Sequence, residues 1–127
     1  MKLLDNLGTE GINFYKNVQL RLDMFYPLGF MLTYSVGCLW CFEKISSWRI
    51  FGIVGAVASF IAGIADYIEN ISIYRMLSAY PEISPKVVSY ANAATVIKSL
   101  ATTVAMIIFI FGLFMVVYFV VKNKLNR

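Results

Sequence analysis

The sequence has no histidine, two cysteines and little charge: Asp, Glu, Lys and Arg make up 14% of its 127 residues. Without an imidazole, haem and zinc sites with His ligands and a His general base are excluded. Most of the chain is instead apolar, with 60% hydrophobic residues and a mean hydropathy of +0.73. A soluble domain of this length is far less apolar, so we expect an integral membrane protein.

The charges that are present give a formal net charge of +4, from 11 basic and 7 acidic residues scattered along the chain. Nucleic-acid-binding domains gather basic residues into a patch or stripe, and this sequence shows none. We therefore expect the lipid bilayer as a partner and no nucleic acid. The residues do not identify a cofactor.

The N-terminus lacks the features of a signal peptide. Residues 1–6 are not followed by an apolar middle and a small-residue cleavage site. We expect the first membrane span to act as its own insertion signal. Because each span takes about 20 apolar residues, three or four helices would use nearly the whole chain. A separate soluble catalytic domain would then have no room.

Apolar periodicity predicts one all-α membrane domain over residues 1–127. An amphipathic helix over 3–23 is expected to lie on the membrane surface or to pack on the bundle. The first span is 24–42, and two longer helices follow at 50–79 and 85–122. If the N-terminal helix inserts, the alternative is a four-helix membrane bundle.

The two long helices are predicted to form an antiparallel hairpin, because Tyr80 to Pro85 interrupts them. Ser84 is expected as N-cap and Pro85 as the first helical residue. The uncharged run 99–121 then lies beside 44–66, so the apolar runs match in depth. Small residues are expected to line the seam between the helices; they are Gly52, Ala56, Ser59, Gly63, Thr95, Thr102 and Ala105.

The candidate site lies near the membrane boundary of this hairpin. Asp66, Glu69 and Asn70 share one helix face because they are spaced by three and four residues. The hairpin register places Asp66 opposite Ser99 and Glu69 opposite Val96, so we expect Lys98 within one turn of both carboxylates. One lysine cannot neutralise two carboxylates, and one negative charge is left over.

Two interpretations of this cluster stay open. Asp66, Glu69, Asn70 and Lys98 can form a ligand- or ion-binding site, because ionisable groups inside membranes often serve function. Alternatively, Lys98 neutralises a carboxylate, Asn70 hydrogen-bonds a neighbouring helix, and the cluster fixes the depth and register of the hairpin. We assign no catalytic residue and no metal ligand.

Cys38 and Cys41 form a CxxC pair within the first predicted span. A membrane redox relay needs a further cysteine pair or a quinone or flavin partner, and the sequence has no third cysteine. Cysteines three residues apart in a helix are more often small packing residues. We expect these two to pack in the core.

The plan of the chain resembles that of the small prokaryotic diacylglycerol kinases, which have an N-terminal surface helix followed by three spans. In that family a Glu-x-x-Asn-x-x-x-Glu motif on the second span and a Lys-Asp pair entering the third serve Mg-ATP and the lipid hydroxyl. Here Glu69 is followed by Ser72 and Met76, and Lys98 is followed by Ser99. The resemblance covers the architecture and not the catalytic motif.

Three functions follow as hypotheses. The first is non-enzymatic: the protein works by association, as a homo-oligomer or as an accessory subunit of a membrane complex. The second is transport of an ion, a proton or a small solute through an oligomer, with Asp66 and Glu69 as the site. The third, implied by the resemblance, is an interfacial lipid enzyme.

The distribution of basic residues bears on topology. We expect an integral protein of a bacterial inner membrane, with a cytoplasmic C-terminus because that face carries slightly more basic residues. They are Lys44, Arg49, Lys122, Lys124 and Arg127 on the C-terminal face, against Lys16, Arg21, Arg75 and Lys86 on the other.

Overall fold

The computed structural model of the protein describes residue 8 and residues 10–43 and 48–126. The predicted start of the N-terminal helix, apart from Gly8 and Glu10, and the charged residues Lys44 and Arg127 lie outside the described residues. All regular elements in the described part are helical. Three helical stretches are long and apolar enough to cross a membrane, namely Glu10–Glu43, Arg49–Ser78 and Pro85–Leu125.

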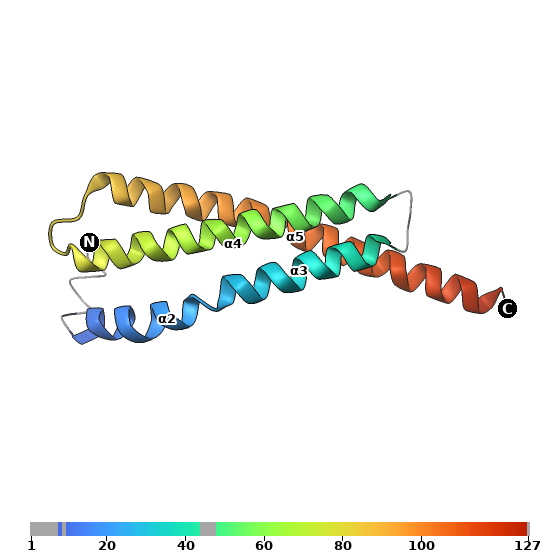
Figure 1. The fold of residues 1–127 in the computed structure, drawn as a ribbon, viewed down its shortest axis with the longest axis horizontal. Coiled ribbons are helices and arrows are strands. Elements are labelled where there is room, and N and C mark those ends of the chain that lie inside the picture. The colour runs from blue at the N-terminus through green and yellow to red at the C-terminus, as the bar shows by residue number, and fades with distance from the viewer. Residues whose placement is uncertain (1–7, 9, 44–47, 127) are drawn as a thin grey trace.

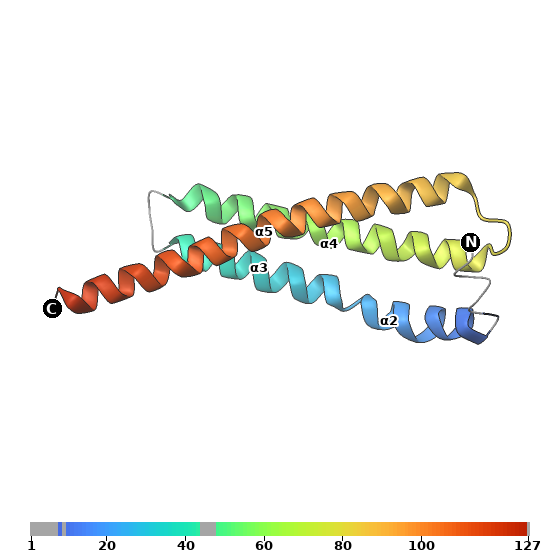
Figure 2. The same ribbon diagram turned by 180° about the vertical axis from the view of Figure 1, so that it is seen from behind.

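The long helices are α3 (Tyr26–Glu43), α4 (Arg49–Ser78) and α5 (Pro85–Leu125). They lie within a few residues of the predicted bounds, and α5 runs three residues further than expected. Figures 1 and 2 show α5 returning along α4 in the opposite direction; α3 lies across α4 from the start of α5, and further along α5 crosses to contact α3 as well. Ser84 stands at the N-cap position without a side-chain capping bond, and Pro85 is the first helical residue.

The helical residues 10–23, here called the N-terminal segment, precede α3 and contain the π-helix η1 (Tyr15–Gln19) and the short α2 (Leu20–Asp23). A turn at Met24 and Phe25 separates this segment from α3. In Figure 1 the segment runs on from α3 and lies beside the outer part of α4. Leu20 is buried there, so the described part of the segment packs against the bundle at this residue.

Glycines on α4 and α5 receive side chains of α3. A Cβ atom on Gly55 would lie 2.7 Å from Cys38 Sγ, and one on Gly112 would lie 2.8 Å from Cys41 Cβ. Both thiols are free and buried, and the Cys38 thiol faces the Ala105 carbonyl oxygen at 3.9 Å. The two cysteines therefore pack in the core, as predicted. Close backbone approach at small residues is how membrane helices gain packing contacts without a hydrophobic effect between them.

The predicted seam between α4 and α5 is corrected in one respect. Gly52 and Gly63 face α3, because a Cβ on Gly52 would meet the Cys38 carbonyl oxygen at 3.1 Å and one on Gly63 would meet Met31. The prediction treated α4 as packing on a single partner, whereas two helices share its small residues. Ser59 is fully buried and donates to the Gly55 carbonyl oxygen in its own helix.

The last turns of α5 extend past the other helices. Phe111 contacts the rings of Phe42 and Trp48, which stand at the ends of α3 and α4. Beyond that level, residues 117–126 are all exposed, and Figures 1 and 2 show them projecting from the bundle. The predicted depth match can be followed only as far as Arg49, the first residue of α4, because residues 44–47, which were expected beside the end of the uncharged run of α5, lie outside the described residues.

Candidate functional site

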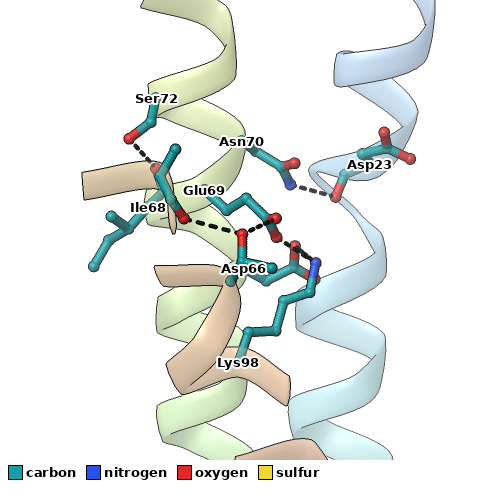
Figure 3. Close-up of polar contacts among 9 residues, drawn as sticks. Asp23, Asp66, Ile68, Glu69, Asn70, Ser72 and Lys98 are labelled. Atoms are coloured by element: carbon teal, nitrogen blue, oxygen red, sulfur yellow. Dashed lines mark hydrogen bonds and ion pairs between the residues drawn. The ribbon is translucent and has the colours of Figure 1, made fainter. Parts of the chain in front are cut away.

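Lys98 on α5 joins the two carboxylates of α4. Its ammonium nitrogen lies 3.1 Å from Asp66 Oδ1 and 2.5 Å from Glu69 Oε2. The side chains of Asp66, Glu69 and Lys98 are 10%, 15% and 35% exposed. Figure 3 shows the three side chains pointing toward one another between α4 and α5. Two carboxylates and one ammonium leave a formal charge of −1 in a largely buried cluster.

The register of α4 and α5 differs from the predicted one by a single residue. Asp66 meets Lys98 instead of Ser99, and Glu69 meets Thr95 instead of Val96. The Thr95 hydroxyl lies 2.5 Å from Glu69 Oε1. Thr95 was expected as a small seam residue and not as a partner of Glu69. Thr95 directly precedes Val96, the predicted partner of Glu69, and this proximity could have identified Thr95.

Asn70 does not contact the ion pairs but joins α4 to the N-terminal segment. Its side-chain amide donates to the backbone carbonyl oxygen of Asp23 at 3.4 Å (Figure 3). In a continuous helix, that carbonyl would accept from the backbone N–H of residue 27, but residue 27 is proline. Asn70 therefore replaces a hydrogen bond that Pro27 removes. This is the contact with a neighbouring helix that the structural interpretation of the cluster expects.

A second contact from α4 holds the same turn. The Tyr67 hydroxyl donates to the backbone carbonyl oxygen of Met24 at 2.9 Å. Tyr67 and the Asp23 carbonyl were not predicted to join the two helices, because the N-terminal segment had no predicted contact residue on α4. The Pro27 position was the only signal, since a proline near a helix start marks a carbonyl four residues earlier that lacks its amide.

The cluster lines a groove whose floor is α4 and whose sides are the N-terminal segment, α3 and α5. We call it the acidic groove; its volume is about 300 Å³, and it is lined by Tyr15, Asp23, Tyr26, Asp66, Glu69 and Lys98. In Figure 3 the Asp23 carboxylate points away from the cluster, so the surplus charge belongs to Asp66 and Glu69. Among the described residues, no three acidic or cysteine side chains converge as metal ligands.

If Arg49 marks one edge of the hydrocarbon region, the groove lies near the other edge. At about 1.5 Å per residue, Asp66 and Glu69 are roughly 26 and 30 Å along α4 from Arg49, close to the ~30 Å thickness of a bilayer core. Charges at such an edge are only partly hydrated. The arrangement can therefore hold one further cationic group against the carboxylates.

No protein-family model matches the chain, and comparisons with curated proteins and with solved structures found no significant similarity. The function is therefore inferred from the geometry of the groove and of the helices that form it.

Proposed function

We propose that this protein works by association in the membrane, as a homo-oligomer or as an accessory subunit of a membrane complex, and that the acidic groove receives a Lys or Arg side chain of the partner. The observation that carries the proposal is the surplus negative charge of Asp66 and Glu69 beside a single Lys98. Both carboxylates line the groove and are not sealed inside the bundle.

A basic side chain on a partner helix suits this groove for electrostatic reasons. A charge near hydrocarbon is costly unless it is paired, and membrane helices commonly pair such charges with one another. Tyr15 and Tyr26 add aromatic walls, which favour an organic cation such as ammonium or guanidinium. The partner is therefore expected to carry Lys or Arg at the hydrocarbon edge, whether it is a second copy or a different protein.

The small-residue seam is not available for this association. Gly52, Gly55 and Gly63 on α4 are filled by side chains or backbone of α3, and Ile108 of α5 also contacts the Gly55 position. The exposed side chains of α4 and α5 within the span are mostly large and aliphatic, as expected for surfaces that face lipid. The acidic groove is thus a polar feature that a partner helix can recognise.

The test is native purification from membranes with a variant that neutralises the cluster. Asp66→Asn and Glu69→Gln keep the side-chain sizes, Lys98→Gln shortens one side chain, and together they remove the charges. We expect this variant to lose the co-purifying partner or the oligomer. The matched control, Glu43→Gln with Glu82→Gln and Lys86→Gln, removes the same kinds of charge from exposed positions and is expected to retain it.

Both variants are first checked for helix content and a single elution peak, so that loss of folding is not mistaken for loss of binding. A wild-type chain that elutes as a monomer under mild extraction, with no partner cross-linked in cells, would contradict the proposal. Equal partner recovery by the wild type and the neutralised variant would contradict the role assigned to the groove.

Transport of a cation or proton is a second candidate, favoured by the Asp66 side chain, which is nine-tenths buried in a membrane helix. The interior between α3, α4 and α5 is filled by side chains at the glycine positions, so a pathway would have to lie between copies. We expect reconstituted vesicles to show a flux that Asp66→Asn or Glu69→Gln abolishes. Identical flux in wild type and double variant would reject transport and leave association in place. No observation at the site favours an interfacial lipid enzyme.

A further inference from the structure

A second pocket lies on the opposite face of the N-terminal segment, between that segment and α4. We call it the basic pocket; its volume is about 360 Å³, and its lining includes Lys16, Leu20, Arg21, Met24, Ile71 and Tyr74. Asn70 stands between it and the acidic groove, because this residue lines both. The N-terminal segment thus separates a cavity with surplus negative charge from one with two positive charges.

The two cations of the basic pocket have no carboxylate partner within the described part of the chain. The ion pairs found there are those of Lys98. The Lys16 ammonium lies 4.8 Å from the ring centre of Tyr74, which orients it toward α4 without neutralising it. Arg21 follows one turn later and brings a planar guanidinium, which binds phosphate oxygens in a bidentate manner.

The pocket is also graded in polarity along the axis of α4, from Tyr74 to Tyr67. Its outer end is marked by Lys16 beside Tyr74, and its inner end by Met24, whose carbonyl oxygen accepts from Tyr67 closer to the span. Met24 and Ile71 are exposed apolar residues at the inner side. A ligand that fits carries an anionic group at one end and a hydrocarbon chain at the other.

The π-helix η1 positions the two basic residues of the pocket, Lys16 and Arg21. Five residues from Tyr15 to Gln19 adopt this wider turn, and it lies directly before Leu20 and Arg21. Single π-turns inside helices often occur at functional sites. Here the wider turn brings Lys16, Leu20 and Arg21 into the lining of one cavity.

We infer that the basic pocket binds the phosphate headgroup of an anionic phospholipid, with Lys16 and Arg21 on the phosphate and the acyl chain leaving along Met24 and Ile71. Basic pockets between membrane helices recognise such headgroups by this combination of charge and apolar contact. This site is separate from the acidic groove, and its occupancy does not depend on the proposed association.

The experiment is native mass spectrometry of the full chain in nanodiscs that contain equal amounts of phosphatidylglycerol and phosphatidylcholine. We expect phosphatidylglycerol to remain bound preferentially after the nanodisc is removed. Lys16→Gln with Arg21→Gln is expected to weaken this retention roughly 10- to 30-fold, because each basic residue near an anionic surface contributes about a factor of five. Lys122→Gln with Lys124→Gln removes the same amount of positive charge from the last turn of α5, outside the basic pocket. This control is expected to leave the lipid retention unchanged.

Two further arms make the outcome decisive. Lys16→Arg with Arg21→Lys keeps both charges and is expected to retain the lipid, which separates loss of charge from loss of folding. Inorganic phosphate and glycerol phosphate are tested as competitors and are expected to displace little lipid, because they lack the chain that contacts Met24 and Ile71. Equal retention of the two lipids, or retention unaffected by Lys16→Gln with Arg21→Gln, would overturn the inference. Full displacement by glycerol phosphate would overturn the lipid assignment.

Discussion

At the scale of single residues, one proline and one asparagine compensate for each other across two helices. Pro27 removes the amide that would bond to the Asp23 carbonyl, and the Asn70 side chain donates to that carbonyl instead. Asn70 follows Asp66 by four residues, and this shared helix face made it a candidate ligand residue. Its contact in the structure is with the backbone of the N-terminal segment, so its role in the fold is positional.

The pairing predicts that the effects of Pro27→Ala and Asn70→Ala depend on each other. Asn70→Ala alone leaves a half-buried carbonyl without its donor and is expected to lower the free energy of unfolding by about 1 kcal/mol. In the Pro27→Ala background, the restored amide of residue 27 bonds to Asp23, and the same substitution should cost less than about 0.5 kcal/mol. Detergent unfolding of the four proteins measures both values. An equal cost in both backgrounds would show that the proline is not the reason for the contact.

A second prediction at this scale concerns Lys98. Because Lys98 contacts both carboxylates, Lys98→Met leaves two unneutralised acids near the hydrocarbon edge, and adding Asp66→Asn should recover part of the loss. Groups in direct contact typically show coupling energies of about 0.5–3 kcal/mol, and the one-third exposure of Lys98 places the expected value in the middle of that range. The same unfolding assay gives the coupling. Additive effects of the two substitutions would mean that the contact contributes nothing.

At the scale of elements, glycines on α4 allow α3 and α5 to pack closely against it. Gly55 is the tightest position that two helices share, because an added Cβ would lie 2.7 Å from Cys38 Sγ and 2.9 Å from Ile108 Cγ2. A Cβ atom added to Gly29 on α3 would meet no other atom within 4 Å. The two glycines therefore provide a matched pair of sites for the same substitution.

Gly55→Ala is expected to destabilise the bundle by about 1–3 kcal/mol, since overpacking forces neighbouring side chains or backbones apart. Gly29→Ala is expected to be neutral or to stabilise by up to about 1 kcal/mol, because alanine is the better helix former. Both values come from detergent unfolding of the single variants. A Gly55→Ala protein as stable as the Gly29→Ala protein would show that α3 and α5 do not converge on α4 as described.

The sequence predicted these elements well where the signal was local. The charge-free runs and the interruption from Tyr80 to Pro85 set the bounds of α4 and the start of α5, and the short connection fixed the register to within one residue at Asp66 and Glu69. Which helix packs on which small-residue face was less predictable. Periodicity shows that Gly52 and Gly63 lie on small-residue faces, but it does not show that α3 occupies those faces.

At the scale of the whole molecule, the helices do not end at one level. The uncharged run of α5 from Ser99 to Val121 is about 34 Å long, slightly more than a bilayer core of ~30 Å. Arg49 and Glu43 end α4 and α3 before that run is complete, and residues 117–126 of α5 are exposed. Either the helices tilt or the bilayer adjusts locally, each at a modest cost per ångström.

The opposite end of the molecule carries the polar features. The N-terminal segment, α4 and α5 enclose the acidic groove there, and the basic pocket lies behind the same segment. The sequence located Asp66, Glu69 and Lys98 because they interrupt apolar helices. It could not locate the groove, because Tyr15 and Tyr26 approach the cluster only through the packing of the N-terminal segment and of the start of α3 beside α4.

Site-specific photocross-linking in living cells shows directly whether a partner protein sits at the acidic groove. A benzoyl-phenylalanine at Tyr26, an exposed aromatic residue that lines the acidic groove, is compared with one at Phe114, an equally exposed aromatic residue of α5 that does not line it. We predict a discrete protein adduct from position 26 that disappears when Asp66→Asn, Glu69→Gln and Lys98→Gln are added, and no such dependence at position 114. An adduct from position 26 that persists in the neutralised variant, or no protein adduct there at all, would contradict the account.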